Sequence, residues 1–441
     1  MIFVQRAKML PLQSQMDEAR RWNARLHPKI NSIERSEQLN KLRHVWRDCI
    51  TDVPYYQNLV NQGKAPQDIK SWKDFRHIPI LDRITLKENQ DQFRRLSGPP
   101  DSYTSTAGST GQPLQLGVWH QDSNLLRVAK LIPWMRLGYT IDSQLVLITG
   151  HAHLLGSGWR RYYNHAIRKA KDWVIGYHRF DAHTIDAEKA NKIAKEIIRI
   201  RPVGLIGYAT FLDLFCRYTT NYHKALRQAG LKFVMSCAEP PPCSDTFALF
   251  RSVFGCSIIQ EFSGIDFGHV GFKIDDAPYT LFPELNILEA EDSFGAVNRG
   301  AALVTTLYKR YVPLIRYKQG DIVTGVERDE LGLVIAFDEQ EGRINDILTL
   351  SDGTNIHGSA ILHCFRDEPS IFNMQLILTD DGPEFSLVVD KAMSPGLEEK
   401  IRYKLGQIHG VFSKALFNYT TDLQTNRAGK RRWVVDQRAK H

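Results

Sequence analysis

Short apolar runs alternate with amphipathic stretches through the middle of the chain. Four of these runs predict buried strands, at residues 145–150, 204–208, 232–237 and 256–262. A helical pattern lies between the first two, with Asp186 as a candidate N-cap and Arg201-Pro202 as its end. The apolar positions on one face of this helix are Ala190, Ile193, Ala194, Ile197 and Ile198. Strands that alternate with helices predict an α/β architecture with a largely parallel sheet.

The two ends of the chain show different patterns. The first hundred residues are mainly helical, with spaced apolar positions from Glu37 to Cys49. From about residue 284 strand-like runs follow one another closely, and the pattern changes again after Gly342. The tail is predicted as strand 374–379, strand 385–390, helix 397–408 and strand 415–420. We therefore expect a large N-terminal α/β domain, residues 1–342, and a small α+β domain, residues 343–441.

Composition excludes several classes of protein. The 441 residues are 43% hydrophobic and 24% charged, as in a globular protein that buries a large core. No apolar run approaches the ~20 residues that span a bilayer, and the N-terminus lacks the apolar region of a secretory signal. Six dispersed cysteines make no disulfide framework. We expect a cytoplasmic protein with no membrane partner.

The formal net charge is +8, and the basic residues are dispersed except for a short run from Lys430 to Arg432. Nucleic-acid proteins usually concentrate their basic residues, so no nucleic-acid partner is expected. A dispersed positive excess favours small anionic ligands such as nucleotides.

The strongest local signal is the segment TSTAGSTGQP, residues 104–113. Its glycines let the backbone approach a ligand closely, and exposed N–H groups and hydroxyls form a nest for phosphate oxygens. No lysine follows Gly111, so the mechanics of the GxxxxGK[ST] phosphate loop do not apply. The same composition also suits a flexible polar linker, and on its own the segment does not decide between the two.

The segments downstream give this loop a context. Those that matter are SCAEPPP (236–242), EFSGIDFG (261–268), LIRYKQGD (314–321), EGRINDILTLSDGTNIHG (341–358) and AGK (428–430). Together with the loop, with Pro54-Tyr55-Tyr56 and with HIPILDRITLKEN (77–89), they resemble in order the motifs of the adenylate-forming superfamily. The resemblance is to its phenylacetate–CoA ligase-like and capsular-polysaccharide (CapK-like) branch, and it covers nearly the whole chain.

The resemblance implies an ATP site. In it the loop would grip the β- and γ-phosphates and support the leaving pyrophosphate, and Thr110 would be catalytic. The residues of the loop that match are Ser105, Thr106, Gly108, Ser109, Thr110 and Gly111. The segment with Ala238, Glu239 and Pro240 would lie against adenine. Asp321 would accept hydrogen bonds from the ribose hydroxyls, and Arg343 would contact ribose or phosphate; the alternative for each is a surface salt bridge.

Three positions of the segment 261–268 depart from the family. Asp266 stands where the family has a glutamate that helps to hold Mg²⁺, and a shorter carboxylate is still a hard oxygen ligand. Its alternative role is to cap the turn that follows the strand. Phe262 replaces the family's tyrosine and would stack on adenine or pack in the core. Ser263 replaces a glycine, which implies an altered substrate wall next to Gly264.

The tail carries the residue expected to do chemistry. Lys430 matches the late catalytic lysine, whose ammonium would bridge the attacking carboxylate and the α-phosphate. Arg431 and Arg432 are rivals, and a basic tail without catalytic function is the alternative. Asn345 and Asp346 match the hinge about which family members turn a mobile lid domain.

Other positions give weaker signals. Tyr208 and Phe211 are candidates for the wall of the acyl pocket, and His151 follows a strand end where ligands of α/β proteins gather. A polar loop is the alternative for His151. The spacings among Cys237, Cys243 and Cys256 differ from those of structural zinc sites. Buried free cysteines are the preferred interpretation of these three.

We therefore expect an AMP-forming acid ligase that uses ATP and Mg²⁺ to convert a small-molecule carboxylic acid to acyl-AMP. Transfer of the acyl group to the thiol of CoA or of a carrier protein would follow. Transfer to an amine is the first alternative. The second is a degenerate relative that binds a nucleotide or an acyl ligand without turnover.

Overall fold

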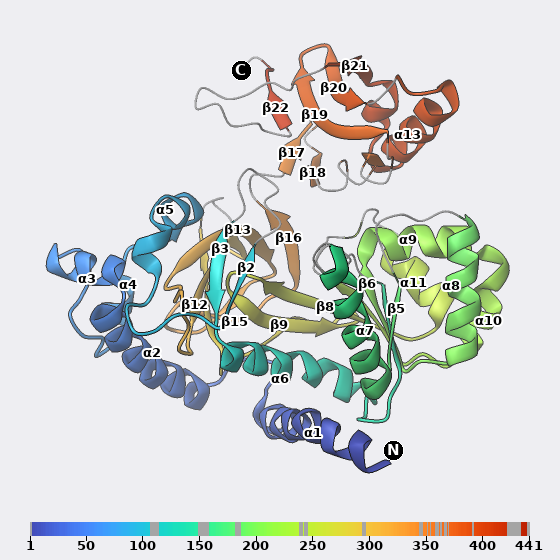
Figure 1. Ribbon diagram of the computed structural model, residues 1–441. Coiled ribbons are helices and arrows are strands. Elements are labelled where there is room, and N and C mark those ends of the chain that lie inside the picture. Colours follow the sequence, from blue (N-terminus) through green and yellow to red (C-terminus); the bar gives the residue numbers. More distant parts are fainter. Residues whose placement is uncertain are drawn as a thin grey trace.

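The computed structural model describes the following residues: 2–105, 114–148, 158–180, 187–237, 241, 246–292, 297–343, 347–350, 352, 354–357, 361, 364–365, 368, 370–389, 392–420 and 434–438. Within them no helix is long and apolar enough to cross a membrane. Figure 1 shows two sheets in the large unit, with helices around them, and a small unit beyond β16 (Glu339–Arg343).

A seven-stranded sheet forms the centre of the large unit. Its first five strands in the chain, β4 to β8, run parallel, and β9 and β10 are added antiparallel. In spatial order the strands are β10 (Thr280–Leu281), β9 (Gly268–Ile274), β8 (Ser257–Gly264), β7 (Phe233–Cys237), β6 (Gly204–Tyr208), β4 (Leu145–Ile148) and β5 (Tyr177–Phe180). All of β4 is buried, as expected of a parallel strand that is covered on both faces.

A five-stranded sheet lies beside it. Its strands are β1 (Leu81–Asp82), β13 (Tyr317–Thr324), β12 (Arg299–Thr306), β11 (Asn286–Glu291) and β16, which pairs with β13. The shorter strand pairs are β2 (Ser102–Ser105) with β3 (Gln115–Val118) and β14 (Glu327–Arg328) with β15 (Val334–Ala336). Within this sheet only β1, which comes from the N-terminal helical segment, is parallel to its neighbour.

Helices cover both faces of the seven-stranded sheet. One face packs Leu147, Met235 and Ile259 against α6, and the other packs Val146 and Val234 among α8, α9 and α11. The helices of the large unit are α1 (Ile2–Arg25), α2 (Ser32–Asp52), α3 (Pro54–Asn61), α4 (Trp72–Arg76), α5 (Arg83–Glu88), η1 (Gln90–Phe93), α6 (His120–Arg136), α7 (Gly158–Ile175), α8 (Ala187–Ile200), α9 (Ala209–Tyr218), η3 (Thr220–Tyr222), α10 (His223–Gln228) and α11 (Thr246–Phe254).

One cation holds the N-terminal helical segment to the five-stranded sheet. The Arg316 guanidinium forms a two-point ion pair with Glu289, at 3.0 and 3.1 Å, with both side chains mostly buried. The same guanidinium donates to the carbonyls of Arg76 and Ile78, at 2.8 and 2.7 Å. The backbone of Arg316 is left-handed, with φ 51°, a conformation that non-glycine residues seldom adopt.

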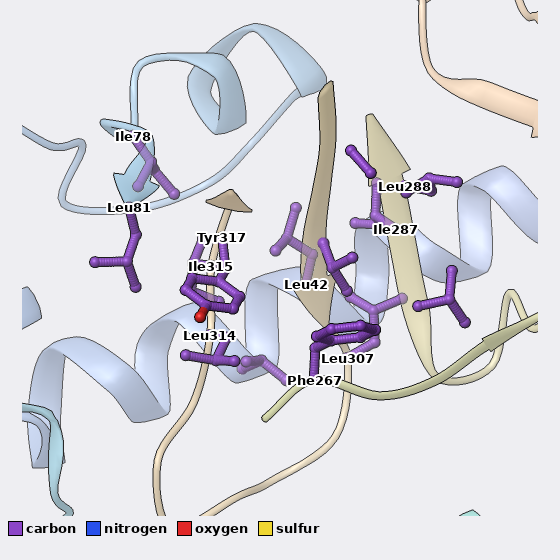
Figure 2. Close-up of a cluster of buried hydrophobic side chains, with 14 of the residues drawn as sticks. Leu42, Ile78, Leu81, Phe267, Ile287, Leu288, Leu307, Leu314, Ile315 and Tyr317 are labelled. Carbon is purple, nitrogen blue, oxygen red and sulfur yellow. The ribbon is translucent and has the colours of Figure 1, made fainter. Parts of the chain in front are cut away.

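Apolar packing completes this attachment. Figure 2 shows Ile78 and Leu81 facing Ile315 and Tyr317, with Leu42 of α2 and Ile287 of β11 in the same cluster. Each of these side chains is almost fully buried.

The small unit has its own core. A four-stranded sheet is packed against α13 (Pro395–Ile408) and η5 (Gly410–Lys414), and the members of its hydrophobic cluster all come from residues 350–434. Its strands in order are β21 (Leu416–Tyr419), β20 (Gly382–Val389), β19 (Ile371–Thr379) and β22 (Val434–Asp436). A separate pair, β17 (Ile347–Thr349) with β18 (Asn355–His357), connects the two units.

The sequence patterns predicted most of these elements. The four buried strands, the helix after residue 186 and the four elements of the tail are all present within a few residues of their expected bounds. Asp186 lies outside the described residues. Strand β22 was not predicted. The domain boundary at residues 342–343 stays a prediction. Strand β16, which ends at Arg343, is paired with β13 of the large unit, and the next strand, β17, is paired with β18.

Replacing the buried arginine should cost much more stability than replacing an exposed one. We expect Arg316→Met to lower the free energy of unfolding by about 3–5 kcal/mol, because Glu289 is left as an unpaired buried charge. Arg199→Met is the control, since Arg199 pairs with Glu196 on the surface at 2.6 Å. It should cost about 0.5 kcal/mol or less. Urea unfolding measures both, and equal losses would contradict the prediction.

Candidate functional site

The hydroxyl-rich segment connects the two strands of a hairpin. Ser105 ends β2 and lies opposite Gln115 of β3. Residues 106–113 lie outside the described residues, so their expected grip on phosphate stays a prediction. Antiparallel strands therefore flank the segment on both sides, whereas in P-loop proteins a strand precedes the phosphate loop and a helix follows it.

Asp321 and Arg343 meet across two strands. They are direct partners in the antiparallel register of β13 and β16, which brings their Cβ atoms to roughly 5 Å. Asp321 is buried and accepts a hydrogen bond from Gln319 Nε2 at 3.3 Å. A buried carboxylate next to an arginine position is an arrangement that can bind a diol or a phosphate ester. The two motif residues are thus brought together, although 22 positions separate them in the chain.

Asp266 is held by protein groups. Its Oδ2 accepts hydrogen bonds from Tyr317 Oη at 3.0 Å and from Arg83 Nη1 at 3.2 Å. Arg310 Nη1 donates to its backbone carbonyl at 2.5 Å. The side chain of Asp266 is 4% exposed. Burial, followed by the charge of Asp266, raises the pKa of Tyr317 and keeps the phenol protonated as a donor.

These contacts bear on the metal role expected for Asp266. An arginine on the same oxygen competes directly with a divalent cation, and burial leaves little room for water ligands. No group of three or more His, Cys, Asp or Glu side chains that could bind a metal occurs in the described part of the chain. The described residues around Asp266 therefore do not fit a Mg²⁺ ion, and its metal role stays a prediction. Its contacts describe a residue that positions Tyr317 and Arg83.

Phe262 lies in the core. It is fully buried, and its ring packs against Phe267 and Phe337, each with a centroid distance of 5.7 Å. Stacking on adenine stays a prediction that these surroundings do not favour. Next to it, Gly264 is needed for close packing, because a Cβ there would lie 2.4 Å from the Phe267 ring.

A buried carboxylate on β8 was not anticipated. Glu261 Oε1 lies 2.5 Å from His269 Nδ1, and the Glu261 side chain is 7% exposed. Burial alone would raise the pKa of Glu261. The charges of His269 and Lys130, with hydrogen bonds from His269 and Ser263, outweigh burial and lower the pKa to about 2. Glu261 therefore stays ionised, with the His269 ring, the Lys130 ammonium and the exposed Ser263 beside it.

The expected acyl-pocket residues differ in their exposure. Tyr208 is half-buried at the carboxyl end of β6, and Ser263 is exposed near the end of β8. Both positions suit a pocket at the edge where the parallel strands end. Phe211 is buried in the hydrophobic cluster under α8 and α9 and has little surface left for a ligand.

The prediction of buried cysteine thiols is met only in part by the two of these cysteines that are described, Cys237 and Cys256. The side chains of Cys237 and Cys256 are half-buried thiols, and the Cys237 thiol donates to the Gly207 carbonyl at 3.4 Å. Burial, with the charge of Asp275, raises the pKa of Cys256 to about 12. Cys243 lies outside the described residues.

Several predicted site residues also lie outside them: Thr106, Gly108, Ser109, Thr110, Gly111, His151, Ala238, Glu239, Pro240, Asn345, Asp346 and Lys430. Their roles stay predictions. The side chains of Ser105 and Arg343 are likewise not described.

Sequence reasoning missed four residues of the site: Arg83, Glu261, Arg310 and Tyr317. Arg83 and Tyr317 fall within segments that carry the family resemblance, but no pattern in the sequence joins either to Asp266. Glu261 directly precedes Phe262 in the run 256–262, which is predicted as a buried strand. A charged residue in a buried strand is seldom unpaired, so its presence indicates a buried ion pair.

Solved structures match this chain, although no family model and no curated protein does. Crystal structures of 2-hydroxyisobutyryl-CoA ligase match over 93% of this chain and 91% of their own. The postadenylation state with 2-HIB-AMP has a TM-score of 0.62 at 17% identity. The thioesterification state with 2-HIB-AMP and CoA has a TM-score of 0.60 at 17% identity. The chain thus has the α/β fold of adenylate-forming ligases over most of its length.

The two interpretations of Asp266 predict different effects of Asp266→Asn. With a positioning role, the variant should lose about 2 kcal/mol of unfolding free energy, because Arg83 loses its charged partner. Urea unfolding measures this loss. Unchanged stability with a strongly weakened dependence on Mg²⁺ would instead favour the metal role.

The stability that Glu261 supplies should disappear in acid. Its folded pKa of about 2 is below the ordinary value of 4.5, so the contribution is complete above pH 4.5 and is lost as the pH falls toward 2. Glu261→Gln should cost about 3 kcal/mol at neutral pH, and the gap to wild type should narrow below pH 4.5. Urea unfolding across this range measures the gap, with the exposed Glu399→Gln as a control. A gap that widens on acidification would contradict the prediction.

Proposed function

We propose that this chain is an ATP-dependent ligase that activates a carboxylic acid as acyl-AMP and then transfers the acyl group to a thiol. The observation that carries the proposal is the cross-strand pairing of Asp321 and Arg343 in a chain with the fold of adenylate-forming ligases. These two motif residues, 22 positions apart in the chain, are partners where β16 leads toward the small unit.

The binding half of the proposal concerns ATP. Asp321 accepts hydrogen bonds from the ribose hydroxyls, since a buried carboxylate is a pure acceptor. Arg343, across the ladder, supplies a planar fork for ribose or phosphate. The hydroxyls and backbone N–H groups of residues 104–111 bind the β- and γ-phosphates. The acyl chain lies at the carboxyl ends of β6 and β8, near Tyr208 and Ser263.

In the first half-reaction a carboxylate oxygen attacks the α-phosphorus. The P–O bond to the β-phosphate breaks, so acyl-AMP forms and pyrophosphate leaves. The barrier comes mainly from repulsion between the carboxylate and the triphosphate, so a positioned cation is effective. Lys430 supplies that cation. No step is assigned to a metal at Asp266, because its oxygen is already paired with Arg83.

In the second half-reaction a thiolate attacks the acyl carbon and AMP leaves. The acceptor is the thiol of CoA or of a carrier protein. 2-Hydroxyisobutyryl-CoA ligase, whose fold this chain shares, has been crystallised with 2-HIB-AMP and CoA. Rotation of the small unit about Asn345 and Asp346 would exchange the two active arrangements. An amine acceptor is the alternative outcome of the acceptor test.

Exchange of labelled pyrophosphate into ATP tests the proposal. Wild-type protein should catalyse exchange with at least one member of a panel of 2-hydroxy, aromatic, short-chain and long-chain acids. Consumption of CoA or of an amine by the active acid then identifies the acceptor. Absence of exchange across the whole panel, with and without Mg²⁺, would contradict the proposal.

Lys430→Ala tests the residue expected to do the chemistry. The exchange rate should fall by about 100-fold or more, because a preorganised charge at the reacting centre is lost. ATP binding, measured by calorimetry, should remain. Lys414→Ala is the matched control, an exposed lysine in the same small unit, and should keep the wild-type rate. Wild-type exchange in Lys430→Ala would refute the assigned role.

A further inference from the structure

Helix α7 turns an apolar face to solvent. Tyr162 is 79% exposed, Tyr163 61% and Trp173 63%, and Ile167 is also exposed. None of its residues belongs to a hydrophobic cluster among the residues that the structure describes. Helices α6, α8, α9 and α11 bury their apolar faces against the same sheet, so α7 is an exception in its own domain.

The exposed apolar residues occupy one side of the helix. At 100° per residue, the sequence GWRRYYNHAIRKAKDWVI places its aromatic and aliphatic side chains within one continuous sector. The members of this sector that are described are Tyr162, Tyr163, Ala166, Ile167, Ala170, Trp173 and Val174. We call this sector the α7 apolar face.

Basic residues flank the α7 apolar face. By sequence the helix carries five basic residues and one acidic residue, Asp172. Arg168 lies on the same side as Asp172, opposite the apolar sector. Lys169 and Lys171 are exposed at the two edges of the sector. The side that α7 presents to solvent is therefore both apolar and positively charged.

The opposite side of the helix is attached to the sheet. Asp172 is buried and forms an ion pair with Arg179 of the edge strand β5 at 2.8 Å. The negative charge of Asp172 is therefore paired on the side of α7 that faces β5 and is not part of its solvent-facing side. Asp172 lies on the side of the helix opposite the α7 apolar face, and Figure 1 shows α7 beside β5.

We propose that α7 is an interfacial helix through which this protein docks on an anionic lipid surface. Tyrosine and tryptophan have an apolar ring and a polar edge, which suits the boundary between headgroups and acyl chains. Lysines at the edges of the apolar sector attract anionic headgroups. Docking needs no membrane-spanning segment, but it departs from the expectation of no membrane partner.

Charge favours lipid over a second copy of the chain. A two-fold contact between α7 apolar faces would place the lysines at the edges of both faces, Lys169 and Lys171 of each copy, around one interface. Like charges placed together at an interface oppose association. The inference goes beyond the proposed function and does not depend on it: docking stands whether or not the chain turns over ATP.

Vesicle flotation tests the proposal with the full-length protein. Wild type should float with vesicles of phosphatidylcholine and about one-third phosphatidylglycerol, and should stay at the bottom with phosphatidylcholine alone. Binding should weaken at about 1 M salt, where the Debye length is about 3 Å. Wild type that stays at the bottom with the anionic vesicles at low salt would overturn the proposal.

Paired variants separate the two components of binding. The triple variant Tyr162→Ser, Tyr163→Ser and Trp173→Ser should lose flotation. Lys169→Glu with Lys171→Glu should weaken partitioning by about tenfold or more, since each basic residue near the surface contributes roughly a fivefold factor. The controls are exposed residues elsewhere, Tyr403→Ser on α13 and Lys192→Glu with Lys195→Glu on α8, and they should float like wild type.

Two further outcomes decide against the proposal. Flotation of both α7 variants at the wild-type level would show that another surface binds lipid. A wild-type dimer that the triple variant dissociates in sedimentation equilibrium would assign the α7 apolar face to self-association. Circular dichroism melts of every variant should match wild type, and pyrophosphate exchange should be unchanged in the Lys169→Glu and Lys171→Glu variant.

Discussion

The arrangement of the large unit depends on the buried guanidinium of Arg316. Its two-point pair with Glu289 fixes β13 to β11, and its bonds to two carbonyls fix the N-terminal segment to the same point. The next residue, Tyr317, pairs with Leu81 and donates to Asp266. A left-handed arginine at this place thus determines where β13 starts and, four residues on, where Asp321 stands. Burial of this charge is favourable only because Nε, Nη1 and Nη2 of the guanidinium all have hydrogen-bond partners.

The same principle governs the carboxylates around β8. Asp266 and Glu261 are both largely buried, and each is paired with groups from other elements. Arg83 lies beside Asp266, and the His269 ring and Lys130 lie beside Glu261. These ion pairs hold the end of β8 in place, at the edge of the parallel sheet where a ligand site is expected. Paired buried charges of this kind stabilise that edge of the sheet and make its stability sensitive to acid.

The hydrophobic pattern predicted the elements well because it reports burial directly. Strand β4 is apolar at every position and helix α8 buries Ala190, Ile193 and Ala194, so period and burial agree. Strand β22 could not be predicted, since three residues carry too little pattern and their pairing with β19 is set by the tertiary fold. In the site, the family resemblance assigned Asp321 and Arg343 to one ATP site, and the structure makes them cross-strand partners. The pairing of Arg83 with Asp266 joins residues 183 positions apart, which no local pattern encodes.

Strand β22 limits how far the preceding residues of the tail can extend from the small unit. Val434 is paired with Leu376 in the sheet of the small unit, and Lys430 precedes Val434 by four residues. Four residues of fully extended chain span at most about 14 Å, so the Cα atom of Lys430 stays within that radius of the sheet edge. The ammonium therefore cannot travel alone over a long path. A phosphate that lies beyond this reach is accessible to Lys430 only through movement of the whole small unit.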